Sequence, residues 1–320
     1  MDDVSAVLDT SEFLPKSLDK VVRLFTVLDE LGRHPRLKGK LCMHGGTAIN
    51  LFMLDVPRLS VDIDLSYIGA AEREAMLAER PNAERAVQQV ATMLGYTVPS
   101  KKGEHAGKSF QLRYTGNWGV DSIKIDMIYL NRVPIRDPVI RQSPLRPSLE
   151  VLTFSDYELV AGKTKALYDR VKMRDIFDIM NLSEHLDNRL ALHPEDDDTC
   201  HKMILFYTSL SNHFPLPFQR RAVERFAGHG KEMEDQLYPM LRSLERPSLE
   251  TMVDTAESFI NRFVLPRDDA EREYLERFSR AVYSPELLFG EASPMTTAAR
   301  LNPEALWKLQ NLKRMVEGGS

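Results

Sequence analysis

The strongest constraint on the fold of this chain comes from one short segment, residues 60–65, in which polar and apolar side chains alternate. This period of two is typical of a β-strand with one solvated face. Because residues i and i+2 of a strand point to the same face, Asp62 and Asp64 project side by side. Their carboxylates repel each other unless a cation lies between them, and hard oxygen ligands suit Mg²⁺. A solvated strand edge explains the segment equally well, so the metal interpretation depends on other residues.

A third carboxylate lies in another predicted strand, at residues 122–130. This is Asp126, which shares a strand face with Lys124. If the two strands are neighbours, three carboxylates meet. Such an arrangement is typical of a two-metal site with ions roughly 4 Å apart.

A glycine turn precedes these strands. Gly45, Gly46 and Thr47 follow a short apolar run and open a predicted helix that ends before Pro57. Glycines allow a phosphate group to approach the backbone, and the free N–H groups of a helix N-terminus favour an anion. The same residues also fit an ordinary tight turn.

A cationic stripe is the third feature, on a helix predicted over residues 156–188. At about 100° per residue, one side of this helix presents Lys163, Arg170, Arg174 and Asp178. Lys165 and Asp175 fall away from the centre of the stripe. Three cations and a carboxylate in line suit a triphosphate, with arginine as a bidentate fork and lysine as a point charge. An exposed helix face with ordinary intrahelical ion pairs is the alternative.

The pattern of predicted elements changes near the middle of the chain. Helices are predicted at residues 14–35 and 71–94, and strands at 110–114 and 122–130. Pro134, Pro138, Pro144 and Pro147 then favour a surface connection between domains. Helical periods follow at 156–188, 199–212, 219–227, 249–264, 268–283 and 303–316. The predicted fold class is α+β, with one domain at residues 1–150 and a mostly helical domain at 151–320.

Composition and failed motifs exclude several classes of protein. A net charge of −5 argues against a nucleic-acid coat, although residues 101–150 carry nine basic against five acidic residues and could attract a polyanion. The apolar runs are far shorter than the ~18 residues of a membrane span, so we expect a cytoplasmic protein with no membrane partner. Residues 103–109 lack the glycine spacing of a P-loop, and no nucleophile elbow accompanies the glycine turn.

The glycine turn, residues 58–65 and the segment from Lys163 to Asp178 resemble one known family. It comprises the AbiEii/AbiGii-type nucleotidyltransferase toxins of bacterial type IV toxin–antitoxin systems, including the mycobacterial MenT proteins. The resemblance spans residues 44–182. It implies a DNA-polymerase-β-like nucleotidyltransferase core, a mixed sheet with flanking helices, followed by a helical domain whose first helix, residues 156–188, contributes to the active site.

The resemblance also implies roles for individual residues. It implies that Mg²⁺, or Mn²⁺ in its place, is held by Asp62 and Asp64 with Asp126. Nucleotide binding is implied for Gly45, Gly46, Thr47, Arg58, Ser60, Lys163, Arg170 and Arg174. Either Asp126 or Asp178 would activate the acceptor hydroxyl, and the resemblance ranks Asp178 slightly higher.

The function implied is transfer of NMP from an NTP to RNA, with the tRNA 3′ acceptor end as the favoured target. Such transfer would inhibit translation and growth in a toxin–antitoxin or phage-defence system. The resemblance implies a cognate antitoxin that acts without a stable complex, and we expect a monomer. Two alternatives stay open: a small-molecule nucleotidyltransferase of the kind that modifies antibiotics, and a catalytically silent NTP-binding regulator.

Overall fold

The computed structural model describes residues 13–99, 106–215, 226, 229–242 and 246–318 of the 320-residue chain. The chain forms two compact units. The first contains Met1–Val133, Asp137–Phe154 and Tyr238–Arg246, and the second contains Pro134–Arg136, Ser155–Leu237 and Pro247–Ser320. No pattern in the sequence indicated that residues 238–246 return to the first unit. The domain assignment at residues 1–150 and 151–320 stays a prediction.

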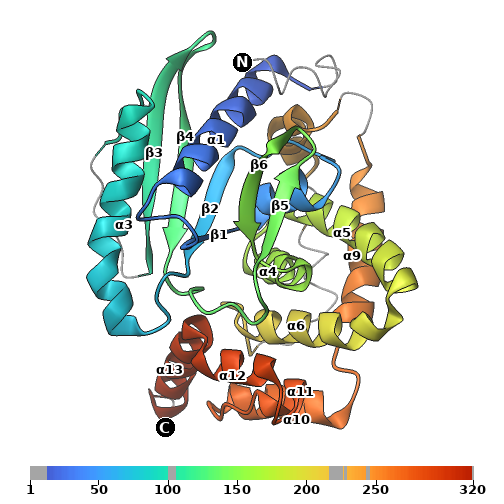
Figure 1. Ribbon diagram of the computed structural model, residues 1–320. Helices are drawn as coiled ribbons and strands as arrows, with labels where there is room; N and C mark the ends of the chain where they lie inside the picture. Colours follow the sequence, from blue (N-terminus) through green and yellow to red (C-terminus); the bar gives the residue numbers. More distant parts are fainter. Residues whose placement is uncertain (1–12, 100–105, 216–225, 227–228, 243–245, 319–320) are drawn as a thin grey trace. The chain divides into compact units, whose positions relative to one another are not determined.

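The first unit is built on a six-stranded mixed sheet with the strand order β3-β4-β2-β1-β6-β5 (Figure 1). Its strands are β1 (Leu41–His44), β2 (Asp62–Tyr67), β3 (Gly107–Gly116), β4 (Gly119–Ile128), β5 (Val139–Ser143) and β6 (Arg146–Thr153). The pairs β2–β4 and β1–β6 are parallel, and the pairs β1–β2, β3–β4 and β5–β6 are antiparallel. The predicted α+β class with a mixed sheet is confirmed.

Two long helices, α1 (Pro15–Arg33) and α3 (Arg73–Met93), flank this sheet (Figure 1). Helix α1 buries the apolar stripe that its sequence period predicts, including Leu24 and Phe25. On the sheet, Ile63 and Ile125 are fully buried. Because side chains alternate along a strand, the polar residues between these apolar ones point to the other face.

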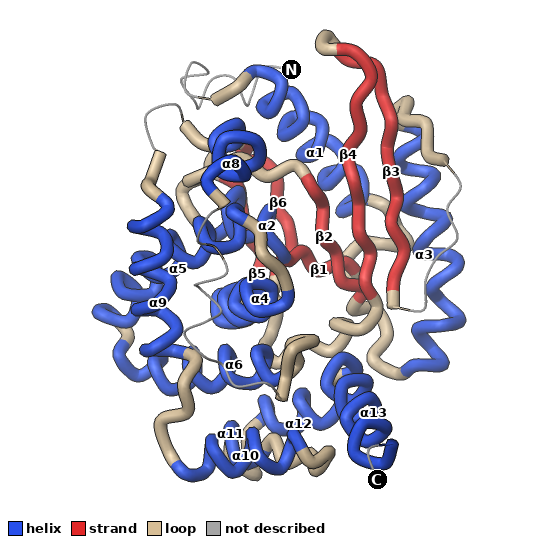
Figure 2. Tube along the Cα trace, turned by 180° about the vertical axis from the view of Figure 1, so that it is seen from behind, coloured by secondary structure: helices blue, strands red, loops and turns tan. Residues whose placement is uncertain are grey.

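The glycine turn lies between β1 and a short helix, α2 (Gly45–Ala48), which continues as a π-helical turn, η1 (Ile49–Met53). The helix predicted here ends before Pro57, as expected. In the view from behind, α2 lies in front of the sheet near β2 (Figure 2). Helix α2 contacts both β1 and β2. The turn therefore lies beside the strand that carries Asp62 and Asp64.

Most of the proline-containing segment is not the surface connection between domains that the sequence predicts, although Pro134 belongs to the second unit. It folds into the antiparallel hairpin β5–β6, with Pro144 in the turn. The register shifts between Gln142 and Ser143, so the pairing passes from Arg146 to Glu150. Pro147 falls in this irregularity and needs no N–H for the ladder. The hairpin joins the sheet through the pairing of β6 with β1, a long-range contact that local proline spacing does not encode.

The second unit is helical. Its longer helices are α4 (Asp156–Asp169), α5 (Met173–Leu192), α6 (Asp197–Ser209), α9 (Leu249–Phe263), α10 (Asp269–Ser279), α12 (Pro294–Leu301) and α13 (Pro303–Gly318), with short turns α8 (Gly230–Glu232) and α11 (Glu286–Phe289). Helix α4 packs against α5 and α6, and α5 packs against α9. The helix predicted at 219–227 lies outside the described residues apart from Phe226. No helix among the described residues is long and apolar enough to span a membrane.

A single helix over residues 156–188 was expected, and this prediction is wrong. Helix α4 ends at Asp169, the backbone of Arg170 is extended with φ −150° and ψ 159°, and α5 begins at Met173. The Asp169 carboxylate accepts hydrogen bonds from the Ser211 hydroxyl and the Asn212 backbone N–H, both at 2.7 Å. These contacts with the end of α6 hold the chain at the break. The cationic stripe is therefore not one continuous helix face.

Candidate active site

Three carboxylates meet on one face of the sheet in the first unit. The parallel pairing of β2 and β4 places Asp64 directly opposite Asp126, and Asp62 opposite Lys124. Neighbouring strands are about 4.8 Å apart, and residues in register on parallel strands share a face. The strands are neighbours, as the sequence argument required, and Asp62, Asp64 and Asp126 lie together.

Asp126 already has two partners in this cluster. Its carboxylate accepts a hydrogen bond from the Ser109 hydroxyl at 2.5 Å and pairs with the Lys124 ammonium at 2.5 Å. The hydrogen bond to Asp126 raises the pKa of Lys124, and the charges of Asp62 and Asp64 add to this effect. The field of all three carboxylates therefore acts on one ammonium group. The sequence marked Lys124 only as a neighbour of Asp126 on the strand.

Gly45 lies directly against the Asp64 carboxylate. A Cβ atom at position 45 would lie only 2.2 Å from the Asp64 Oδ2 atom, and the φ angle of Gly45 is +72°. The left-handed backbone favours glycine, and a Cβ atom here would displace the Asp64 side chain. The preceding residue, His44, stacks its ring on Phe154 at 5.6 Å between centroids. The end of β1 thus holds the glycine turn against a carboxylate.

Thr47 fastens the glycine turn to β2. Its side chain is fully buried, and its hydroxyl is hydrogen-bonded to the backbone carbonyl of Asp62 and, at 2.8 Å, to the Ser60 hydroxyl. Asn50 donates to the Gly46 carbonyl at 2.9 Å. These bonds fix the turn relative to the carboxylates. Both hydrogen-bond partners of the Thr47 hydroxyl are groups of the protein itself.

Arg58 is buried in the loop before β2. It donates to the Leu59 carbonyl at 2.9 Å, and its backbone forms an isolated bridge with Leu241. The Leu59 N–H also donates to the Met240 carbonyl at 2.8 Å. Arg58 therefore lies in a loop held by Met240 and Leu241, a long-range contact that the sequence did not indicate.

A second charged cluster lies in the helical unit and joins α4 to α5. The Lys163 ammonium pairs with Asp178 at 2.7 Å and with Asp175 at 2.9 Å. Asp175 also accepts a hydrogen bond from the Arg170 Nε atom at 2.7 Å. Lys163, Asp175 and Asp178 are all buried. Asp175 thus stands at the centre of the cluster, although a continuous helix would have turned it away from Lys163.

Lys163, Arg170, Asp175 and Asp178, which we call the helix cluster, contribute two positive and two negative charges. Burial raises the pKa of Asp175, but attraction to Lys163 and the hydrogen bond from Arg170 outweigh burial and hold that pKa well below its usual range. The Arg170 side chain is 58% exposed, in contrast to Lys163 at 4%. Arg174, half-buried at the start of α5, forms no ion pair with the residues that the structure describes.

The carboxylates of Asp62, Asp64 and Asp126, which we call the sheet cluster, fit a divalent cation. Asp62 and Asp64 offer hard oxygen ligands beside a tight glycine turn, which is the chemistry that Mg²⁺ and Mn²⁺ prefer. Within the described ranges, no group of three or more His, Cys, Asp or Glu residues forms a ready metal site. Asp126 is paired with the Lys124 ammonium in this structure.

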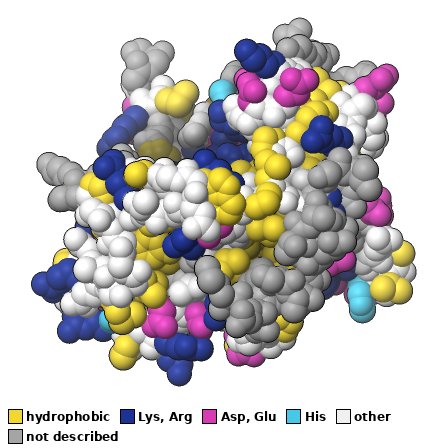
Figure 3. Space-filling model, turned by 90° about the horizontal axis from the view of Figure 1, so that it is seen from above, with side chains coloured by type: hydrophobic (Ala, Val, Ile, Leu, Met, Phe, Trp, Pro, Cys, Tyr) yellow, Lys and Arg dark blue, Asp and Glu magenta, His cyan; other side chains and the backbone are white. Residues whose placement is uncertain are grey.

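Four of the basic residues in the segment 101–150, which could attract a polyanion, have partners inside the protein. Lys108 pairs with Glu84, Arg132 donates to the Ala71 carbonyl, Arg136 lies over the Tyr157 ring, and Arg141 donates to Thr153. Lys101 and Lys102 lie outside the described residues. On the face drawn in Figure 3, basic side chains are interspersed with acidic and apolar ones.

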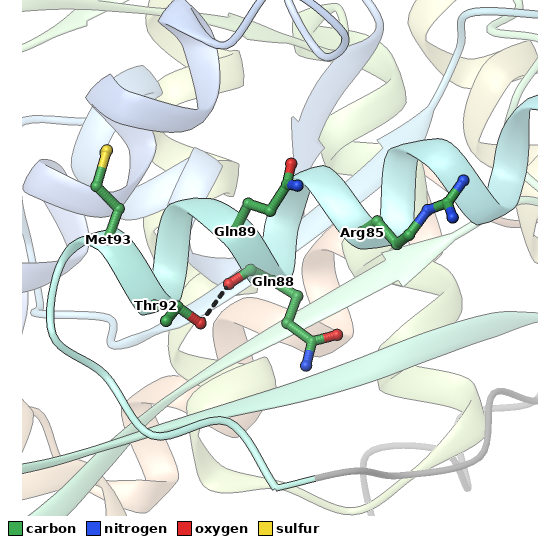
Figure 4. A pocket seen from close by; sticks show the side chains of 5 residues that line it. All are labelled: Arg85, Gln88, Gln89, Thr92 and Met93. Atoms are coloured by element: carbon green, nitrogen blue, oxygen red, sulfur yellow. Dashed lines mark hydrogen bonds between the residues drawn. The ribbon is translucent and has the colours of Figure 1, made fainter.

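A surface depression of about 440 Å³ lies on α3, and none of the three carboxylates of the sheet lines it. Its lining comes from one helix: Arg85, Gln88, Gln89, Thr92 and Met93 (Figure 4). The Thr92 hydroxyl donates to the Gln88 carbonyl at 2.9 Å, as in an ordinary helix. The depression has no convergent titratable groups and carries no functional assignment.

Comparison with known families decides the identity of the fold. The model described as nucleotidyl transferase AbiEii toxin, type IV TA system, matches residues 27–282. The chain belongs to the AbiEii nucleotidyltransferase toxin family. This confirms the family resemblance that the glycine turn and the carboxylate segments indicated. A comparison with curated protein sequences finds no match.

Two solved structures share the fold of this AbiEii family member. MenT4, the nucleotidyltransferase toxin Rv2826c from Mycobacterium tuberculosis H37Rv, has a TM-score of 0.54 and 15% identity, covering 92% of this chain and 93% of that one. JHP933 from Helicobacter pylori has a TM-score of 0.51 and 13% identity, covering 83% and 96%. At these identities the likeness establishes the fold.

Proposed function

We propose that this protein transfers an NMP group from an NTP to the 3′ end of RNA, with tRNA as the favoured acceptor. The observation that carries the proposal is the position of Asp64, which lies opposite Asp126, two residues from Asp62, and against Gly45. Membership of the AbiEii family supplies the reaction class. In a cell, such modification of tRNA would block translation and growth unless a cognate antitoxin intervened.

The proposed reaction is an in-line displacement at the α-phosphorus atom. The acceptor 3′ oxygen forms a bond to this phosphorus, the bond from phosphorus to the oxygen that bridges to the β-phosphate breaks, and pyrophosphate leaves. The backbone at Gly45 and Gly46 is suited to phosphate, because it opens α2, whose N-terminus has no side-chain cap and favours an anion. Thr47 and Ser60 would keep this turn in place.

A divalent cation, Mg²⁺ or Mn²⁺, would neutralise the developing phosphate charge when bound. Asp62 and Asp64 are the residues proposed to hold it, with Asp126 as the third carboxylate. Asp126 is also the more accessible of the two candidates for the acceptor proton, with its side chain 25% exposed. Asp178 is fully buried and paired with Lys163. We therefore assign the proton to Asp126 and the positioning of Lys163 to Asp178.

The helix cations complete the proposal on the basis of the family resemblance. Arg170 and Arg174 are the residues proposed to bind the triphosphate or the leaving pyrophosphate, because their side chains are at least partly exposed. Lys163 is proposed to contribute positive charge while it holds Asp175 and Asp178 in place. Arg58 would hold the loop before β2.

The direct test is incubation of the purified protein with α-labelled NTPs, MgCl₂ and total RNA. We expect label at RNA 3′ ends, and none with the Asp64→Asn variant. Asp121→Asn is the matched control, because Asp121 lies on β4 with its side chain paired to Lys20. Label on a small-molecule acceptor instead of RNA would favour the antibiotic-type alternative. Binding of NTP with no transfer to any acceptor would favour the silent regulator.

A further inference from the structure

The hairpin of β3 and β4 extends beyond the rest of the sheet (Figures 1 and 2). Strand β4 pairs with β2 only from Lys124 to Ile128, whereas its pairing with β3 continues to Gly119. We call residues 112–123 the distal ribbon. From Lys124 to the turn residue Trp118 the chain advances six residues, or roughly 20 Å at about 3.4 Å per residue. The ribbon thus begins beside the carboxylates and ends well away from them.

The two faces of the hairpin differ sharply. The residues on the face of Asp126, which follow from the strand register, are Ser109, Gln111, Arg113 and Thr115 on β3 and Val120, Ser122 and Lys124 on β4. All of them are exposed or half-exposed. The opposite face carries the buried Leu112 and Ile123. The face that carries Asp126 therefore continues along the ribbon as a polar surface, and its described side chains are accessible to solvent.

Charge and aromatic character change along this face. The carboxylates Asp62, Asp64 and Asp126 gather at one end. Beyond Lys124, the described residues of this face include Arg113 and no acidic side chain. At the tip, Trp118 is 49% exposed and Val120 is 78% exposed. The face therefore offers positive charge next to the carboxylates and an indole ring at its far end.

We propose that this face of the distal ribbon binds the single-stranded 3′ segment of the RNA acceptor, an inference that rests on the proposed function. Trp118 would stack on an unpaired base several nucleotides from the reacting end, and Arg113 and Lys124 would contact the phosphates between. An aromatic ring can stack on any unpaired base but not on one inside a duplex. The absence of acidic residues beyond Lys124 on this face matches a phosphate backbone. The face is also continuous with the candidate active site.

Intrinsic fluorescence tests this proposal without depending on catalysis. The chain has two tryptophans, Trp118 and Trp307, with similar exposures of 49% and 44%. In the Trp307→Phe variant, Trp118 is the only reporter, and single-stranded RNA should quench it with an affinity that falls as salt rises. In the Trp118→Phe variant, the same RNA should leave the fluorescence of Trp307 unchanged. A duplex without an overhang should quench neither tryptophan.

Kinetics provides the second readout. Trp118→Ala should raise the KM for RNA by about ten-fold and leave the KM for NTP unchanged, and Trp307→Ala should change neither. Arg113→Gln should raise the KM for RNA and flatten its salt dependence. Quenching of Trp118 by RNA supports the ribbon assignment even if the wild type transfers no label, a result that would overturn only the proposed function. Lack of quenching by RNA overturns the ribbon assignment, as does quenching by a protein partner alone.

Discussion

The sheet cluster and the helix cluster contain the same kinds of charged group in different proportions. On the sheet, Asp62, Asp64 and Asp126 share one ammonium group, that of Lys124. In the helical unit, Asp175 and Asp178 are matched by Lys163 and Arg170. Excess carboxylate charge destabilises a fold, and a protein retains it where a cation or substrate binds. Balanced buried charge holds secondary-structure elements in place. We therefore expect the carboxylates of the sheet to take part in the chemistry and the buried ion pairs of Lys163 with Asp175 and Asp178 to hold α4 and α5 together.

The largest expected effect is on folding, from Lys163→Met. This change leaves two buried carboxylates without their ammonium partner, and breaking a buried pair costs about 3–5 kcal/mol. Chemical denaturation followed by circular dichroism should show a loss of this size. Lys172→Met, at an exposed position in the same break, is the control and should change stability by less than about 0.5 kcal/mol. If the two variants are equally stable, the ion pairs of Lys163 do not hold α4 and α5 in place, and the prediction is wrong.

Asp62→Asn should differ from Lys163→Met, because we expect it to reduce activity and not stability. Transfer of label to RNA should fall by about 10²–10³-fold, because one preorganised charge is lost from the site. The free energy of unfolding should stay the same or rise, because repulsion with Asp64 is relieved. Rate measurements and denaturation on one preparation separate the two effects. A variant that loses both activity and stability would make the sheet cluster structural, like the helix cluster.

Gly45→Ala sharpens the comparison at the glycine turn. The added methyl group meets the Asp64 carboxylate, and the φ angle of +72° strains any residue with a Cβ atom. We expect a loss of about 1–3 kcal/mol in stability together with lower activity. Gly39→Ala is the matched control, because its φ angle is +71° and no atom lies within 4 Å of its Cβ position. If both variants behave alike, backbone strain alone accounts for the loss.

The smallest effect concerns acid stability. The pKa of Asp175 is lowered in the folded state, so its ion pairs contribute stability above the unfolded pKa of about 3.9 that is lost as pH falls toward the folded pKa. The wild type should therefore lose stability as pH falls from 5 to 3, with a contribution from Asp175 below about 1.4 kcal/mol per pH unit. The Asp175→Asn variant should be less stable than the wild type at neutral pH, and its free energy of unfolding should fall less steeply between pH 5 and pH 3. If this slope is the same in the variant and the wild type, Asp175 is not ionised in the folded state.

Local period and spacing predicted the sheet cluster well. Alternation placed Asp62 and Asp64 on one strand face, and the pairing of β2 with β4 needed only that two predicted strands be neighbours. The helix cluster was predicted less well. Its geometry depends on the break at Arg170, where the sequence has neither proline nor glycine. The neighbouring Asp169 contacts Ser211, a residue distant in the sequence. Asp175 was therefore assigned to the wrong side, and no local signal could have corrected this.

The long-range pairings explain the other differences. The hairpin of β5 and β6 joins the sheet through Met43 and Thr153, residues more than a hundred positions apart. The return of residues 238–246 to the loop at Arg58 is of the same kind. Proline spacing and helical period describe only neighbours along the chain. Such contacts become visible only in the folded structure.

The most direct test of the sheet cluster is thermal unfolding as a function of Mg²⁺ concentration. A ligand that binds only the folded state raises the melting temperature by mass action. Wild type and Asp121→Asn should both gain stability with added Mg²⁺. The Asp62→Asn, Asp64→Asn double variant should start at an equal or higher melting temperature and show no response. A response in the double variant equal to that of the wild type, or none in the wild type, would contradict the assignment of these carboxylates to a cation.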